Sequence, residues 1–182
     1  MPRYIAFLRA INVGGHTVKM DALSTYFREL GFTDVETFIA SGNVVFDSTA
    51  TDEERLSGHI ESRLRERLGY EVATFLRSVP EVVAVAAHDP FPGEPLPPEG
   101  AMNIGFLATR LDVSAEASLR ALETDIDRLH VHGREIYWRC LLRQSQSKVS
   151  GAAIEKAAGT RTTIRGLNTV RRLAAKYGRA PG

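Results

Sequence analysis

Residues 89–100 read DPFPGEPLPPEG, and this stretch limits what the chain can form more than any other. It holds five prolines and two glycines. Proline has no backbone N–H and a fixed φ, so neither a helix nor a central strand can continue through these residues. The stretch therefore predicts a linker or an extended crossing loop that separates residues 1–88 from residues 101–182.

The first part of the chain shows the element order β-α-β-β-α-β. Strands are expected at residues 3–11, 34–40, 43–47 and 72–77, from short apolar runs bounded by turn residues. Helices are expected at residues 19–30 and from residue 51 to 69, with Gly31 and Gly69 as C-terminal stops. A short third helix should end at Asp89-Pro90. Thr51 with Glu54, and Ser78 with Glu81, match the capping box that opens a helix.

The second part shows a similar order with low sequence identity to the first. Strands are expected at 101–108, 128–132, 135–142 and 162–164, and helices at 114–122, around 154–158 and at 168–177. We therefore predict an α+β fold of two ferredoxin-like (αβ-plait) halves, each β-α-β-β-α-β-like, plus a C-terminal helix. The predicted domains are 1–88, the connection 89–100, and 101–182 with its basic terminal helix.

Charge is unevenly distributed along the chain. Residues 1–138 carry a net charge of −8 and residues 139–182 a net charge of +9, with Glu155 as the single acid of that segment. A basic block attracts anions such as a nucleic acid, a nucleotide or an acidic metabolite. The alternative is a solvated basic face that pairs with the acidic remainder of the same chain.

The composition is that of a water-soluble globular protein, with 43% hydrophobic and 25% charged residues. No apolar run approaches the length of a membrane span, and no signal-peptide pattern opens the sequence, so we expect a cytoplasmic protein without a membrane partner. The single cysteine, Cys140, excludes an internal disulfide framework. By alternation it shares a strand face with Ile136 and Trp138, which favours a core position.

A glycine-containing turn follows the first predicted strand: Arg9 precedes Asn12-Val-Gly14-Gly15-His16. Glycines between a strand and a helix can turn backbone N–H groups toward an anion. The stretch matches neither of the two common nucleotide-binding glycine motifs, so a tight structural turn is the stronger interpretation from the residues alone. Arg9 would then be an exposed edge residue or a partner of an acid.

Other motifs carry weaker signals. Ser145-Gln-Ser147-Lys148 matches S-x-x-K but lacks the companion motifs of the serine enzymes that use it. The five histidines show no metal-ligand spacing beyond His130-x-His132, which is more often two residues on one strand face, so no metal site is predicted. Near the C-terminus, Arg165 precedes Asn168, a good N-cap, and a guanidinium at a helix start suits a phosphate or a carboxylate.

Four stretches together resemble an uncharacterised bacterial family called domain of unknown function 1697 (DUF1697). They are FLRAINVGGHTVKM, TFIASGNVVFDS, Ser147-Lys148 and TTIRGLNTVRRLAAK. The resemblance implies an α+β fold with two αβ-plait halves. The sequence departs from the family pattern in the last motif, which usually reads Arg-Asn-Trp-Asn-Thr. Here Gly166 and Leu167 replace the first asparagine and the tryptophan.

The resemblance, added to the residue types, points to a small-anion site at the junction of the two halves. The expected ligand is a nucleotide or a phosphorylated small molecule, no cofactor is expected, and no general base or nucleophile is evident. The residues expected to contribute are Arg9, Asn12, Gly14, Gly15, Ser41, Asn43, Lys148, Arg165, Asn168 and Thr169. Two alternatives stay open: a nucleic-acid-binding protein that uses the basic C-terminal segment, and an enzyme of unknown reaction that uses Ser145, Ser147 and Lys148. Whether the chain is an enzyme stays undecided.

Overall fold

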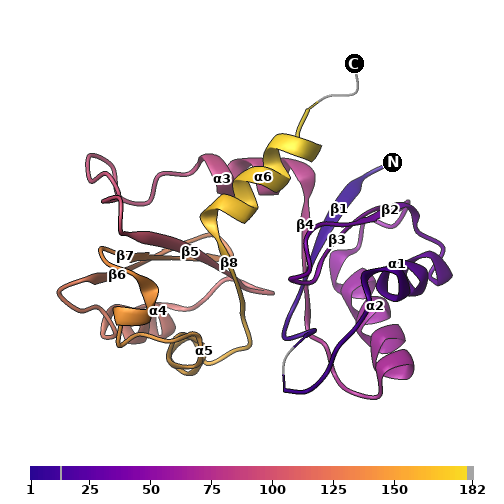
Figure 1. Ribbon diagram of the computed structural model, residues 1–182, viewed down its shortest axis with the longest axis horizontal. Coiled ribbons are helices and arrows are strands. Elements are labelled where there is room, and N and C mark those ends of the chain that lie inside the picture. Colours follow the sequence, from indigo (N-terminus) through magenta and orange to yellow (C-terminus); the bar gives the residue numbers. More distant parts are fainter. Residues whose placement is uncertain (13, 180–182) are drawn as a thin grey trace. The chain divides into compact units, whose positions relative to one another are not determined.

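The computed structural model describes residues 1–12 and 14–179, which form two compact units (Figure 1). The first unit is Met1–Val83 together with the residues from Lys176 onward, and the second is Ala84–Ala175. Each unit holds one four-stranded sheet. No helix among the described residues is long and apolar enough to cross a membrane.

The first unit is an antiparallel sheet with the strand order β2-β3-β1-β4. Its elements are β1 (Arg3–Leu8), α1 (Met20–Glu29), β2 (Thr33–Thr37), β3 (Asn43–Asp47), α2 (Glu53–Leu68) and β4 (Thr74–Ser78). Helices α1 and α2 pack on one face of this sheet, with Phe27, Ile60 and Phe46 in their common core (Figure 1). Burial of such side chains stabilises the unit by about 1.5–3 kcal/mol each.

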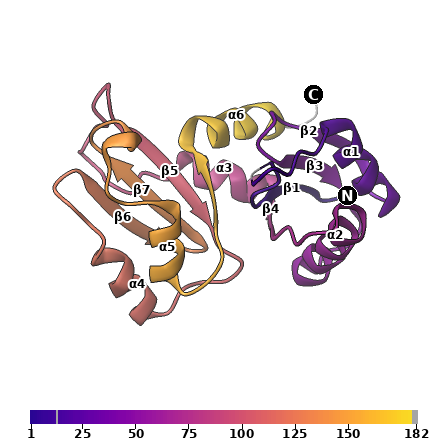
Figure 2. The ribbon, with the colours of Figure 1, turned by 60° about the horizontal axis from the view of Figure 1, so that its bottom comes forward.

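The second unit repeats this topology in its own antiparallel sheet, with the order β6-β7-β5-β8. Its elements are β5 (Ala101–Phe106), α4 (Val113–Arg120), β6 (Asp127–His132), β7 (Glu135–Cys140), α5 (Gly151–Ala158) and β8 (Thr163–Gly166). Figure 2 shows α4 and α5 on one face of the sheet. Their core includes Trp138, Ile136 and Leu119.

One further helix follows the last strand of each sheet: α3 (Val79–Ala87) follows β4, and α6 (Leu167–Tyr177) follows β8. With them, the element order confirms the predicted α+β fold of two ferredoxin-like halves and a C-terminal helix. The expected hairpin about Gly133 is present, and Gly133 has φ +61° as a tight turn requires.

Local signals predicted the capping box at α3 correctly and the one at α2 wrongly. The capping box of Ser78 and Glu81 is present, because Ser78 N donates to Glu81 Oε2 at 2.7 Å and Glu81 N donates to Ser78 Oγ at 3.4 Å. At α2 the predicted pair of Thr51 and Glu54 is wrong by one position. Asp52 is the N-cap, and its carboxylate accepts from Arg55 N at 3.0 Å. Asp is preferred over Thr at the N-cap, and here this preference outweighs the capping-box pattern that favoured Thr51.

A buried carboxylate, Asp127, joins three segments of the second unit. Its Oδ1 accepts hydrogen bonds from Trp138 Nε1 at 2.9 Å and Ser147 Oγ at 2.7 Å, and its Oδ2 accepts one from Thr124 Oγ1 at 2.8 Å. Burial raises the pKa of Asp127, but the hydrogen bonds from Trp138, Ser147 and Thr124 outweigh it, so the pKa lies below 3.8. The folded state therefore prefers the ionised carboxylate.

Asp127→Asn should lower the free energy of unfolding by about 1–3 kcal/mol at pH 7, because an amide nitrogen cannot accept a bond that the carboxylate accepts. Since the folded pKa lies below the unfolded one, this stability is present above the unfolded value of 3.8 and is lost as the pH falls through the folded value. Urea unfolding measures the difference in the free energy of unfolding between the unaltered chain and Asp127→Asn. This difference should be smaller at pH values below 4 than at pH 7. Exposed Asp125→Asn is the control, and a difference independent of pH would contradict the account.

Candidate functional site

Asn12 ties the loop after β1 to the segment before β3. Its Nδ2 donates to Ala40 O at 3.0 Å, and its Oδ1 accepts from Val18 N at 2.8 Å. Beside it, Leu8 N donates to Gly42 O at 2.8 Å. The two N-terminal stretches that carry the family resemblance therefore contact each other. The hydrogen bonds of Asn12 give this residue a structural role that requires no ligand.

The Ser41-Gly42-Asn43 turn has an equally complete structural role. Asn43 is fully buried, and its Nδ2 donates to Phe38 O at 3.1 Å and to Ser41 Oγ at 2.9 Å. Gly42 has φ +80°, and a Cβ there would lie 2.7 Å from Ile11 Cγ2. Only glycine fits this close approach of the turn to the loop after β1.

Gly14 and Gly15 are exposed, with φ +64° and +83°, and a Cβ at either would meet no atom within 4 Å. These glycines serve the backbone conformation of the loop rather than a close approach to other atoms of the chain. Arg9 is half-buried just beyond the end of β1, and its N donates to Ala73 O at 2.9 Å. The strand stops at Leu8 rather than at residue 11, because Ala10 has φ +54°, which no strand residue adopts.

In the second unit, Arg165 lies in a different environment from the one expected. It is a buried residue of β8, and its Nη1 donates to Thr163 Oγ1 at 2.8 Å and to Ile164 O at 3.0 Å. Burial lowers its pKa from 12.5 to about 10. Arg165 lies just before the start of α6, as expected, but its guanidinium is buried against the side chain and backbone of its own strand.

The remaining C-terminal site residues lie in separate places. The helix α6 begins at Leu167, so Asn168 stands in its first turn rather than at its N-cap, and Asn168 is exposed while Thr169 is half-buried. Lys148 is exposed on the segment after a short 3-10 turn (Gln144–Gln146) that contains Ser145. Ser147 donates to Asp127 and accepts from Val149 N at 3.0 Å, which gives its hydroxyl a structural role.

The predicted site residues therefore divide between the two units. Asn12, Ser41 and Asn43 come together in the first unit, with Arg9, Gly14 and Gly15 on the same loop. Lys148, Arg165, Asn168 and Thr169 belong to the second unit. Convergence of the two sets on one anion stays a prediction.

A pocket of about 460 Å³ lies in the second unit, and its volume is within the range of small-molecule sites. One wall comes from the crossing loop, by which we mean residues 89–100. The other walls come from the end of α3, from β5 and β7, and from the start of α6. The residues that line it are Ala87, His88, Asp89, Pro90, Phe91, Gly93, Glu94, Pro95, Leu96, Met102, Tyr137, Arg139, Leu167 and Arg171.

The sheet of the second unit supplies the pocket with polar side chains because of strand alternation. On β7, Ile136 and Trp138 point into the core under α4 and α5, so Tyr137 and Arg139 face the other side of the sheet. Tyr137 O–H donates to Val85 O at 3.4 Å, and this bond fixes the last turn of α3 against β7. The crossing loop lies over Arg139 on this side.

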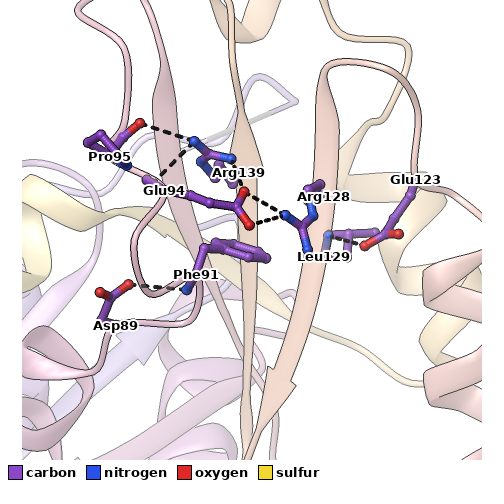
Figure 3. Close-up of polar contacts among 8 residues, drawn as sticks. All are labelled: Asp89, Phe91, Glu94, Pro95, Glu123, Arg128, Leu129 and Arg139. Carbon is purple, nitrogen blue, oxygen red and sulfur yellow. Dashed lines mark hydrogen bonds and ion pairs between the residues drawn. The ribbon is translucent and has the colours of Figure 1, made fainter.

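Glu94 and two arginines hold the crossing loop on the sheet, and we call Glu94, Arg128 and Arg139 the Glu94 latch (Figure 3). Arg128 Nη1 donates to Glu94 Oε2 at 2.6 Å and Arg139 Nη1 to the same oxygen at 3.1 Å. Arg139 Nη2 also donates to Glu94 O at 3.3 Å and to Pro95 O at 3.1 Å. Hydrogen bonding from Arg128, with the charges of both arginines, holds the pKa of Glu94 below its usual value.

An aromatic ring and two unpaired polar atoms complete the pocket. The Phe91 ring lies 4.9 Å from the guanidinium carbon of Arg128 and 5.7 Å from that of Arg139, within cation–π range. Arg139 Nε and His88 Nε2 are buried and have no hydrogen-bond partner among the described residues. Buried polar atoms are usually paired, so these two call for an explanation.

Comparison with known proteins places the chain in a family. The family described as "Protein of unknown function (DUF1697)" matches residues 1–137. The chain belongs to the DUF1697 family. Residues 138–182, which include Lys148 and Arg165, lie outside the matched segment.

A solved structure with a similar fold is that of the conserved bacterial protein SP0830 from Streptococcus pneumoniae. The two chains are 23% identical, with a TM-score of 0.79, and the likeness covers 98% of this chain and 99% of the other. At this identity the likeness shows that the DUF1697 chain and SP0830 share a fold. No curated protein matches the chain.

The sequence of this DUF1697 protein did not reveal the pocket. Residues 89–100 were interpreted as a linker or an extended crossing loop, and no spacing linked Glu94 to Arg139, which is 45 residues away. Two signals were available in hindsight: an aromatic residue, Phe91, between two prolines, and Arg139 between the buried Trp138 and Cys140. Both become meaningful only when the sheet is assembled.

Glu94→Ala should loosen the crossing loop without unfolding the second unit, because the Glu94 side chain and its partner Arg128 are both exposed and belong to no core cluster. Deuterium exchange at the amides of Phe91 and Glu94, which bond to Asp89 Oδ1 and Phe91 O, should become severalfold faster. The melting temperature should change little. Glu99→Ala, an exposed residue of the same loop, is the matched control, and equal exchange rates in both variants would contradict the latch.

Proposed function

We propose that the second unit binds a small organic anion, of the nucleotide or phosphorylated-metabolite class, in the pocket beneath the crossing loop. The observation that carries this proposal is the buried and unpaired Arg139 Nε in the wall of a pocket of about 460 Å³. An oxygen of a bound anion would supply the missing acceptor. Hydrogen bonds to charged groups contribute about 1.5–3 kcal/mol each.

The charges around the pocket favour an anion. The two carboxylates of its wall are already engaged: Glu94 with Arg128 and Arg139, and Asp89 with the N–H of Phe91 at 3.1 Å. Arg171 is an exposed pocket-lining residue of α6. Guanidinium groups bind phosphates and carboxylates with paired N–H donors, so Arg171 can receive an anion that enters from solvent.

The apolar part of the pocket suits a planar group on the same ligand. Phe91 and Tyr137 present aromatic rings, and Met102 and Leu167 add aliphatic surface. Clefts that combine such surface with a few convergent polar groups are the usual binding sites of small molecules. A phosphate at the arginines and a base or another ring at the aromatic residues would use both parts.

Binding requires the crossing loop to shift, because Arg139 Nε is covered in this structure. The Glu94 latch is the contact that would open. Release of Arg139 from Glu94 and Pro95 would free its guanidinium for the ligand, so ligand and loop would compete for the same donors.

The hypotheses drawn from the sequence stay predictions beside this proposal. A junction site that uses Arg9, Gly14, Gly15 and Lys148 is one of them, as are binding of nucleic acid by the basic C-terminal segment and serine chemistry. The structural hydrogen bonds of Asn12, Asn43 and Ser147 weigh against these residues as ligand contacts. The pocket has the advantage that its lining donors belong to one compact unit.

Arg171→Ala should weaken binding of pyrophosphate and of AMP at least about tenfold, because a charge-assisted hydrogen bond contributes about 1.5–3 kcal/mol. The measurement is isothermal titration at low salt on EDTA-treated protein, with ligand-induced thermal stabilisation as a second readout. Arg161→Ala is the matched control, since Arg161 is exposed in the same unit and does not line the pocket.

Three results decide this test. Loss of binding in Arg171→Ala with retention in Arg161→Ala supports the pocket. Equal weakening in both variants would mean that only overall charge matters, and this would overturn the proposal. Absence of saturable binding of pyrophosphate, AMP and ATP to the unaltered chain would overturn it as well.

A further inference from the structure

Three histidines gather on the pocket side of the second unit, and we refer to His88, His130 and His132 as the histidine cluster. Each offers one ring nitrogen, and these three atoms lie within 4.8 Å of one another. We propose that this cluster binds a divalent transition-metal ion of the zinc class. This inference rests on the cluster itself and does not depend on the anion proposed above.

The fold brings the three imidazoles together by two independent means. His130 and His132 are two residues apart on β6, so they project from the same face, opposite Tyr137 and Glu135 of β7. His88 follows α3 and continues its last turn, since His88 N donates to Ala84 O at 3.0 Å. The bond from Tyr137 O–H to Val85 O fixes that turn on β7.

The cluster has a feature that a purely structural group of histidines would not need. His88 Nε2 is buried and has no hydrogen-bond partner among the described residues. A buried ring nitrogen without a partner costs free energy, and a metal ion is one group that would satisfy it.

The rings are close enough for coordination after small side-chain rotations. His88 and His132 stack with centroids 4.0 Å apart, and His88 and His130 lie 5.7 Å apart. Zinc–nitrogen bonds of about 2.0–2.1 Å place the nitrogens of a tetrahedral site about 3.4 Å apart. The three nitrogens would therefore approach by no more than about 1.5 Å, and His132, the exposed member of the cluster, is the one on the solvent side.

The chemistry of the donor set selects the metal class. Three neutral imidazoles suit Zn²⁺, Co²⁺, Ni²⁺ or Cu²⁺, whereas Mg²⁺ and Ca²⁺ prefer oxygen ligands. Three protein ligands leave a fourth position for water, as in zinc sites that are open to substrate. His88 also lines the pocket, so that position is within reach of a ligand bound there.

The sequence predicted no metal site because only His130-x-His132 shows ligand spacing. That pair was interpreted as two residues on one strand face, and the register of β6 with β7 agrees with this placement. His88 is separated from the pair along the chain by the crossing loop, β5 and α4. Its contribution depends on how α3 ends against β7, which no motif encodes.

The test titrates Zn²⁺ alone into the full chain, prepared without an affinity tag and treated with EDTA. One equivalent should bind, and Co²⁺ in its place should give the intense visible absorption of a four-coordinate site. His132→Gln should weaken binding at least tenfold, because loss of a mere outer-shell partner already costs about 10–100-fold. His59→Gln, an exposed histidine outside the cluster, should bind as the unaltered chain does.

Two results would overturn the inference: no saturable Zn²⁺ binding, or the same affinity in the unaltered chain and in His132→Gln. His132 is exposed, so its replacement removes the stacking contact with His88 but no side chain of the core. Arg171→Ala should bind Zn²⁺ normally. The metal proposal and the anion proposal are therefore tested by separate measurements, and either can be contradicted without the other.

Discussion

The bonds from Arg139 to Glu94 and Pro95 are the interaction on which the pocket depends. They hold a segment that contains five prolines, and therefore has few backbone donors of its own, against a sheet. Without a regular element to anchor it, such a segment needs side-chain partners to stay in one place. The Nε–H of the same guanidinium is buried without a partner among the described residues, and this donor is the basis of the proposed function.

The two faces of the sheet in the second unit have different roles, because successive side chains of β7 point to opposite faces. One face buries Trp138 and Ile136 under α4 and α5, and Asp127 anchors Trp138 from β6. The opposite face carries Tyr137 and Arg139, together with the histidines of β6. A well-packed face thus provides the rigid support that a binding site on the other face requires.

The fold of this DUF1697 protein was predictable because its signals are local. Gly31 and Gly69 end helices, and both have the positive φ that favours glycine there. The strand spanning Asn43–Asp47 was predicted with its observed bounds. The errors were local too: β1 ends early because Ala10 leaves the extended region, and α2 starts from Asp52 rather than from Thr51.

The candidate site was far less predictable because its contacts are long-range. The conspicuous polar residues Asn12 and Asn43 have backbone partners that explain them, so their polarity did not indicate a ligand. The roles of Arg139 and His88 could not be inferred from local patterns, since their neighbours in space are distant in sequence. Loop residues become functional candidates only after the scaffold that positions them is known.

The most direct test of the central claim is a titration of the ¹⁵N-labelled full chain with pyrophosphate, followed by amide chemical shifts. The account predicts that the largest shift changes occur at Phe91, Glu94, Arg139 and Arg171. The amide shifts of Gly14 and Gly15 should stay nearly unchanged. Largest shifts at Gly14 and Gly15, with none around the crossing loop, would contradict it.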